Sequence, residues 1–253
     1  MEVTTIQGEP RTERGRRQIA QLRASGKRQA VVDAVTDADL LAIGSACRDL
    51  LLVTGASGVA QGLPQNFRHG GLLGAAAQPR VPQITGRSAV LAGSCSAATR
   101  AQVEVARNCW PSFVLDPLEM MAGRQTADDI LDWADASMGD RPLLIYSSAP
   151  PRAVHHVQQE LGRQHAGELV EQCMGRIASG LVQRGVRRLI VAGGETSGAV
   201  VQSLAVSGLR IGPEIDPGVP WCETIDQPAL ALALKSGNFG SDDFFLKAYG
   251  MLP

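Results

Sequence analysis

The chain has 253 residues, of which 44% are hydrophobic and 19% charged, and its formal net charge is −1. At about 150 residues per domain this length predicts one to two domains, with enough chain for a buried core. The near-neutral charge argues against a nucleic-acid partner, which needs clustered Lys and Arg. No apolar run is long enough to span a membrane, and the N-terminus lacks the order of a signal peptide. We therefore expect a cytoplasmic protein without a membrane partner.

Cysteine and histidine usage predicts no metal centre. The five cysteines lie at wide, irregular spacing without a CxxC pair, so we expect small buried hydrophobic side chains in a reducing compartment. The four histidines show no metal-type spacing with acidic or Cys partners. We therefore assign no residue as a metal ligand.

The first part of the chain, residues 1–64, is predicted to be the end of an α/β domain. A basic helix is expected over 11–27, a short strand over 29–35, and a helix from Asp37, with Asp37 as its N-cap. The sequence DLLLVTGASGVA then predicts a buried strand followed by a Gly/Ser loop. The basic helix has two interpretations, namely a solvated surface helix or a helix whose packing partner lies outside this chain.

The remainder divides into a linker, 65–85, and a second domain, 86–253. Residues 65–85 are rich in Gly, Pro and Gln and predict a linker. From 86 to 253 apolar strands alternate with helices, including a helix capped by Thr126 and a long amphipathic helix over 165–185. This alternation predicts an α/β fold, with a largely parallel or mixed sheet covered by helices on both faces.

Three strand-to-helix loops share one design and could carry chemistry. They are Gly93–Thr99, Gly193–Gly198 and Lys235–Gly240. Ligands of open α/β sheets gather at the carboxyl ends of strands, and the N–H groups at a helix N-terminus suit phosphate. Glycine lets the backbone approach a ligand closely. The loops therefore predict a polyphosphate site, although each could equally be a tight packing turn, and none is a Walker A or GxGxxG motif.

Three side chains near these loops have two interpretations each, and one further loop has a single interpretation. Glu195 could hold magnesium through water or bind a ribose hydroxyl, or it could only favour the helix N-terminus. Lys235 could neutralise phosphate or extend to solvent. Trp221 could stack on a nucleobase or pack in the core. The loop Thr54–Gly58 could line the cleft from another side.

Four motifs in order carry a resemblance to a known family. GSCS followed by Thr99, then GGETSGAVV, PGVPW and KSGNFG resemble the C-terminal nucleotide-binding domain of the four-carbon acid sugar kinases. The resemblance runs from about Ala30 to the C-terminus. It implies ATP and Mg²⁺ as cofactors and a small sugar acid such as threonate, erythronate or a 3-oxo-tetronate as substrate. It places ATP contacts on Ser94 or Ser96 and on Gly193, Gly194, Glu195, Thr196 and Gly237.

The sequence also departs from that family. The resemblance implies an opening D-D-F-T-G-A motif in a substrate-binding domain, and this motif is not in the sequence. Residues 11–64 resemble only the end of that domain, so no catalytic residue is assigned. The expected function is the ATP-binding part of a kinase. The alternative is a non-catalytic nucleotide-binding module that needs a separately encoded substrate domain, and a homo-oligomer is also compatible.

Overall fold

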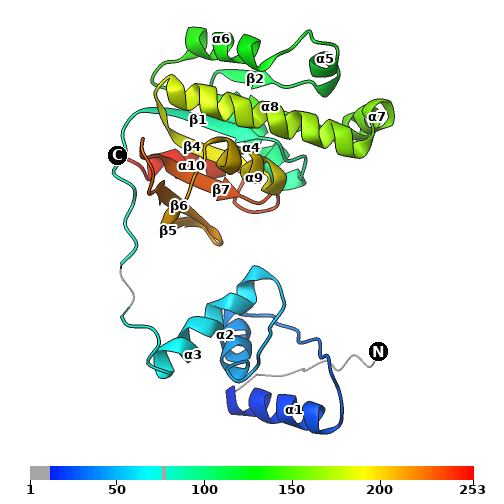
Figure 1. Ribbon diagram of the computed structural model, residues 1–253, viewed down its shortest axis with the longest axis vertical. Helices are drawn as coiled ribbons and strands as arrows, with labels where there is room; N and C mark the ends of the chain where they lie inside the picture. The colour runs from blue at the N-terminus through cyan, green and yellow to red at the C-terminus, as the bar shows by residue number, and fades with distance from the viewer. Residues whose placement is uncertain (1–11, 76–77) are drawn as a thin grey trace. The chain divides into compact units, whose positions relative to one another are not determined.

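The computed structural model describes residues 12–75 and 78–253 (Figure 1). The chain forms two compact units, Met1–Gln78 and Pro79–Pro253. Among the residues described, none of the helices combines the length and the apolar character needed to cross a membrane. Each unit is taken in turn below.

The described part of the first unit is a small helical assembly. Its elements are α1 (Thr12–Ala24), α2 (Asp37–Ala46), the 3₁₀ helix η1 (Ser57–Gly62) and α3 (Leu63–His69). The close approach of α2 and η1 requires glycine, because a Cβ on Gly44 would lie 2.5 Å from Gly62 Cα. Buried Asn66 ties α3 to this contact by donating from Nδ2 to Gly44 O at 2.8 Å. The range predicted as a linker, 65–85, therefore begins inside a helix.

Both strands expected in this unit are absent from its described residues. Residues 29–35 and 50–54 have no regular structure, and Leu51 and Leu52 are 104% and 84% exposed. A strand needs a neighbour for its backbone hydrogen bonds, and neither segment has one in the described chain. The predicted cap of α2 is also wrong. Thr36 is the N-cap, and it forms a capping box with Asp39.

The second unit contains a mixed seven-stranded sheet in the order β2-β3-β1-β4-β7-β6-β5. Strands β2, β3, β1, β4 and β7 are parallel to one another, whereas β6 and β5 add an antiparallel edge next to β7. This confirms the predicted mixed sheet. The strands are β1 (Arg87–Ala92), β2 (Ser112–Val114), β3 (Leu143–Tyr146), β4 (Val186–Ala192), β5 (Leu209–Asp216), β6 (Val219–Thr224) and β7 (Ala231–Lys235).

Helices cover both faces of this sheet, as the sequence predicts (Figure 1). In β1 the side chains alternate between two cores: Ala89 and Leu91 belong to one, Val90 and Ala92 to the other. The first core includes α6 (Ala127–Ser137), α8 (Arg163–Gln183) and α9 (Gly194–Ser203). The second includes α4 (Ala97–Arg107) and α10 (Phe244–Gly250). Both faces of the central strands are therefore buried, which explains their continuous apolar sequences.

Local signals fix several helix ends. Thr126 caps α6, as predicted, and forms a capping box with Asp129. Two other helices are additional to the prediction: α5 (Pro117–Met121) follows β2, and α7 (Pro151–Leu161) lies between β3 and α8. Proline stands at the start of both, where its missing N–H costs nothing.

The core also settles the role of Trp221. Its side chain is fully buried, and Nε1 donates to Ala248 O at 2.8 Å. The core interpretation is therefore confirmed and stacking on a base is excluded. Burial of the cysteines is confirmed for Cys47, Cys173 and Cys222, whereas Cys95 is partly buried and Cys109 is exposed.

Candidate functional site

The three glycine-containing loops meet at the carboxyl ends of β1, β4 and β7. Gly193 N donates to Lys235 O at 2.8 Å, and Gly93 N and Ser94 N donate to Ala192 O at 3.0 and 3.1 Å. A Cβ on Gly93 would overlap Oγ1 of Thr196. Gly193 has φ +133°, a region that favours glycine, and a Cβ there would lie 3.2 Å from Ser94 N. These glycines let two loops pack backbone against backbone.

Loop β7–α10 is held by the start of α4. The carbonyl of Gly237 accepts hydrogen bonds from Ser96 Oγ at 2.6 Å, Thr99 Oγ1 at 2.8 Å and Lys235 Nζ at 3.0 Å. Further along, Gln102 Nε2 lies 3.0, 3.1 and 3.0 Å from the carbonyl oxygens of Phe239, Gly240 and Ser241. Consecutive carbonyls are thus drawn towards α4. The loop N–H groups of Gly237 and Asn238 have no partner among the described residues.

The two candidate serines of the first loop have different surroundings. Ser96 is the N-cap of α4, where its Oγ accepts from Thr99 N and donates to Gly237 O. Ser94 Oγ accepts from Ser96 N at 3.2 Å, and Ser94 lines the cavity described below. The Ser96 hydroxyl is therefore occupied by the fold, whereas Ser94 Oγ lies next to Gly237, where an added Cβ would overlap it.

Lys235 does not extend to solvent. Its side chain is fully buried, and Nζ donates to Thr99 Oγ1 at 2.9 Å, Ser236 O at 3.1 Å and Gly237 O at 3.0 Å. An ammonium group has three protons, so each finds an acceptor, and all the acceptors are neutral. Burial lowers the pKa of Lys235 to about 8. Lys235 therefore adds positive charge beneath the loops, but its ammonium protons are all donated to protein acceptors.

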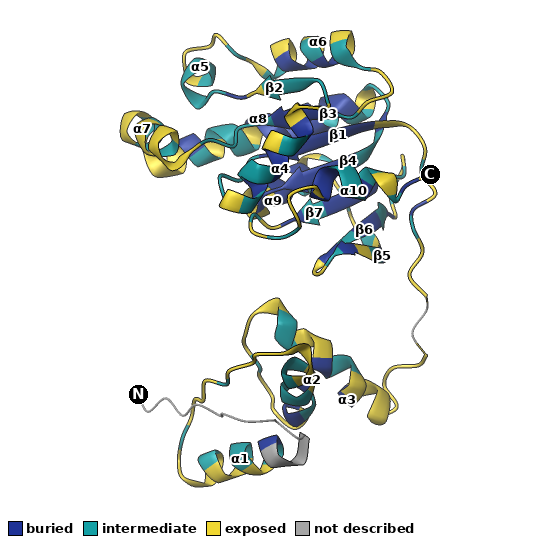
Figure 2. Ribbon diagram, turned by 180° about the vertical axis from the view of Figure 1, so that it is seen from behind, coloured by how far each residue is buried: buried dark blue, intermediate teal, exposed yellow. Residues whose placement is uncertain are grey.

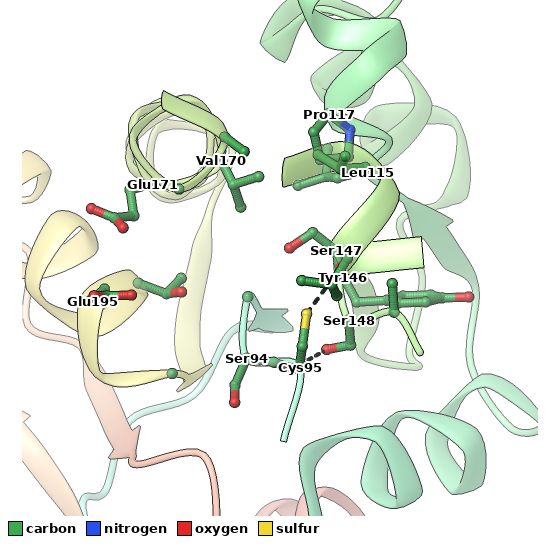
Figure 3. A pocket seen from close by; sticks show the side chains of 18 of the residues that line it. Ser94, Cys95, Leu115, Pro117, Tyr146, Ser147, Ser148, Val170, Glu171 and Glu195 are labelled. Atoms are coloured by element: carbon green, nitrogen blue, oxygen red, sulfur yellow. Dashed lines mark hydrogen bonds between the residues drawn. The ribbon is translucent and has the colours of Figure 1, made fainter. Parts of the chain in front are cut away.

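A cavity of about 1000 Å³ opens beside two of the loops (Figure 3). One end is formed by Gly93–Cys95 and by Gly193, Gly194, Glu195 and Thr196. Ser148 supports this end, because its Oγ donates to Ser94 O at 2.6 Å. Ser96 and Gly237 lie behind the lining rather than in it. Of the seven predicted site residues, five line one wall of the cavity: Ser94, Gly193, Gly194, Glu195 and Thr196. The other two, Ser96 and Gly237, lie against this wall.

Gly194 has a special position in that wall. It is the first residue of α9, it is exposed, and a Cβ placed on it would meet no atom within 4 Å. The N-terminal N–H groups of α9 and the positive end of its dipole therefore face open space. Free N–H groups at a helix N-terminus are suited to an anion such as a phosphate group.

Two glutamates lie at one side of the cavity. Glu195 on α9 and Glu171 on α8 both line it, and Figure 3 shows them as neighbours. Burial, followed by the negative charges of Glu195 and Glu168, raises the pKa of Glu171. Carboxylate oxygens are suitable ligands for Mg²⁺, which commonly takes one or two of them together with water and phosphate oxygens. No group of three or more metal-ligating side chains occurs in the described ranges.

The predicted second wall from Thr54–Gly58 belongs to the first unit. Within the second unit, α7 and α8 line the cavity, and the sequence analysis associates neither of them with the site. The sequence analysis also does not predict that Gln102 and Thr99 hold the loop after β7. Thr99 follows Ser96 by three residues, and Gln102 follows Thr99 by three. This helical spacing could have indicated them, because residues three apart lie on one face of a helix.

Comparison with known proteins identifies both parts of the chain. Residues 89–245 match the family model described as a nucleotide-binding C-terminal domain, and residues 2–63 match a sugar-binding N-terminal domain. The chain is 54% identical to a 3-oxo-tetronate kinase of Cupriavidus necator over 92% of its length, and 54% identical to one of Burkholderia multivorans over 91%. It spans 54% of the length of each of these relatives.

Two solved structures share the fold of this chain. A crystal structure from Salmonella typhimurium LT2 is similar at a TM-score of 0.79 and 34% identity, covering 100% of this chain and 60% of that one. A Haemophilus influenzae protein is similar at a TM-score of 0.69 and 36% identity, with 100% and 61% covered. Since the nucleotide-binding family model covers more than half of the residues, the chain belongs to the four-carbon acid sugar kinase family.

Proposed function

We propose that this chain binds ATP with Mg²⁺ and forms the nucleotide-binding part of a kinase that phosphorylates a four-carbon acid sugar. One observation carries the proposal: the open N-terminus of α9 at Gly194 lies beside the first loop and above the buried charge of Lys235. This arrangement offers backbone donors, a hydroxyl and positive potential to a polyphosphate. The names of the relatives favour 3-oxo-tetronate as the sugar acid.

Each site residue then has a defined task. The N–H groups around Gly193, Gly194 and Thr196 and the hydroxyl of Ser94 bind phosphate oxygens. Gly237 belongs to the loop that presents its N–H groups from the other side, and Ser96 holds that loop. Mg²⁺, when bound, would neutralise part of the phosphate charge. Glu195 either holds that ion through water or accepts a hydrogen bond from a ribose hydroxyl.

Isothermal titration calorimetry tests the proposal. The chain is expected to bind ATP in the presence of Mg²⁺. A chain that is folded by circular dichroism and shows no binding contradicts the proposed function.

The variant Glu195→Gln separates the two tasks of this carboxylate. If it holds Mg²⁺, the variant should weaken ATP binding only when Mg²⁺ is present; if it binds ribose, binding should weaken with and without the ion. We expect a loss of about tenfold, typical of one charged hydrogen bond. Glu160→Gln is the matched control, because Glu160 is exposed on α7 and outside the cavity lining. Equal titrations for Glu195→Gln and Glu160→Gln would remove Glu195 from the site.

A second candidate rests on the D-D-F-T-G-A motif, which the sequence does not contain. In this case the chain binds ATP but transfers phosphate only with a separately supplied sugar-binding segment. Phosphoryl transfer needs the acceptor hydroxyl positioned in line with the γ-phosphate. A transfer assay with threonate, erythronate and 3-oxo-tetronate distinguishes the candidates. ATP binding without transfer favours the module, and product formation by the chain alone favours the complete kinase.

A further inference from the structure

Gln102 is a buried polar residue with no task in the proposed function. Helix α4 is buried along one face and exposed along the other (Figure 2), and Gln102 lies fully buried on the first of these faces. Its Nε2 lies 3.0, 3.1 and 3.0 Å from the carbonyl oxygens of Phe239, Gly240 and Ser241. Its Oε1 is buried without a hydrogen-bond partner in the described chain. An unpartnered buried acceptor lowers stability, so packing alone does not explain this side chain.

The contacts with the loop fix which end of this amide faces the carbonyls. Three carbonyl oxygens converge on Nε2, and an oxygen atom in its place would be repelled by all three. The loop backbone also closes tightly around the amide. Gly240 has φ +85°, and a Cβ there would lie 3.1 Å from Gln102 Nε2 and 2.6 Å from Phe244 Cδ2. Glycine therefore lets the loop approach Gln102 this closely.

The peptide plane passes this hold on to the N–H groups of the loop. The peptide bonds of the loop are trans, so the carbonyl of one residue and the N–H of the next point in opposite directions. Because the Gly240 carbonyl points to Gln102, the N–H of Ser241 points away from α4, and it donates to Asp216 Oδ2 at 3.0 Å. The Phe239 carbonyl turns the N–H of Gly240 away from α4 in the same manner. That N–H group has no partner among the described residues.

We propose that Gln102 is a positioning residue for the polyphosphate of ATP, and that it acts by aiming the N–H groups of the loop after β7. The inference rests on the proposed function, in which this loop is one side of the phosphate site. The amide of Gln102 holds consecutive carbonyls on the α4 side, so the N–H groups of Asn238 and Gly240 stay available to phosphate oxygens on the other side. Without these hydrogen bonds the peptide units can rotate, and the donors no longer converge on one anion.

Gln102→Glu tests this role, because it keeps the shape of the side chain and replaces the amide nitrogen by oxygen. A protonated carboxyl group still donates to one carbonyl, whereas an ionised one repels all three. Burial raises the pKa of such a group. The ATP affinity of the variant, divided by that of the unchanged chain at the same pH with Mg²⁺, should be near one at about pH 5 and about tenfold lower at about pH 8.

The matched control is Gln202→Glu, which adds the same charge at an exposed position of α9 outside the cavity lining. It should bind ATP as the unchanged chain does at both pH values. Four charged groups contact the loop, and all of them are present in every protein compared, so their titration cancels in the ratio: Lys235, Asp216, Asp243 and Lys247.

Gln102→Met keeps the test decisive if the glutamate variant does not fold. Methionine fills a similar space without a donor, so ATP and inorganic tripolyphosphate should each bind about tenfold more weakly, which places the effect at the phosphates. Calorimetry measures both affinities, and circular dichroism checks folding at each pH. A lower midpoint of thermal unfolding with full ATP affinity would show a purely structural role and overturn the proposal. If the folded, unchanged chain binds no ATP, the proposed function itself fails and this inference fails with it.

Discussion

Replacing Gly194 with valine is expected to lower the affinity for ATP by about 10- to 100-fold, equivalent to the loss of one charge-assisted hydrogen bond. A Cβ at this position meets no protein atom within 4 Å, so the new side chain occupies only the space in front of the α9 N-terminus. Valine also has a higher helix propensity than glycine, so the midpoint of thermal unfolding should not fall. Calorimetry with ATP and a thermal melt measure the two effects.

Gly198→Val is the matched control for this prediction. Gly198 lies on the same helix, is exposed, also has open space around its Cβ position, and is outside the cavity lining. It should leave ATP affinity unchanged. Equal affinities for both variants would show that no ligand approaches the start of α9. Gly237 is unsuited to this test, because a Cβ there would overlap Ser94 Oγ and disturb the packing of the loops.

Replacing Lys235 with methionine is expected to remove a pH dependence of stability. Burial lowers the pKa of Lys235 from 10.5 to about 8. Between these two values the folded chain has released the proton that the unfolded chain still holds, so the free energy of unfolding rises with pH. Relative to Lys235→Met, the unchanged chain should gain stability from pH 8 to pH 10.5 and show no such gain below pH 7.

Denaturant unfolding of both proteins at a series of pH values provides the measurement. Methionine has a similar length and can fill the same space, and Gly237 O keeps the hydroxyls of Ser96 and Thr99 as donors. The difference between the two curves therefore isolates the ammonium group. Parallel curves across this pH range would mean that Lys235 titrates as an ordinary surface lysine.

Much of the second unit is predictable because its signals are local. Strands such as β1 and β4 are short apolar runs, and the Thr126 capping box marks the start of α6 within four residues of sequence. The three loops also follow from sequence, since each joins an apolar strand to a helix. Their meeting at one edge follows from the parallel order of β1, β4 and β7.

Other features depend on partners far apart in the sequence. The buried ammonium group of Lys235 donates a hydrogen bond to Thr99, which is 136 residues away in the sequence. No local sequence pattern reveals such a partner. Ser96 likewise depends on a distant partner, because its hydroxyl donates to the carbonyl of Gly237. The sequence alone could not distinguish it from Ser94. The apolar runs at 29–35 and 50–54 show the reverse case. Their composition favours strands, but composition alone supplies no neighbouring strand.

Because α4 fixes the loop after β7, this loop is ordered before a ligand binds. Ser96, Thr99 and Gln102 fix the carbonyls of residues 237, 239, 240 and 241 before anything binds. Little conformational entropy remains to be lost there, so association at this edge proceeds without an ordering step. We therefore expect any change of conformation on ligand binding to arise in segments other than this loop.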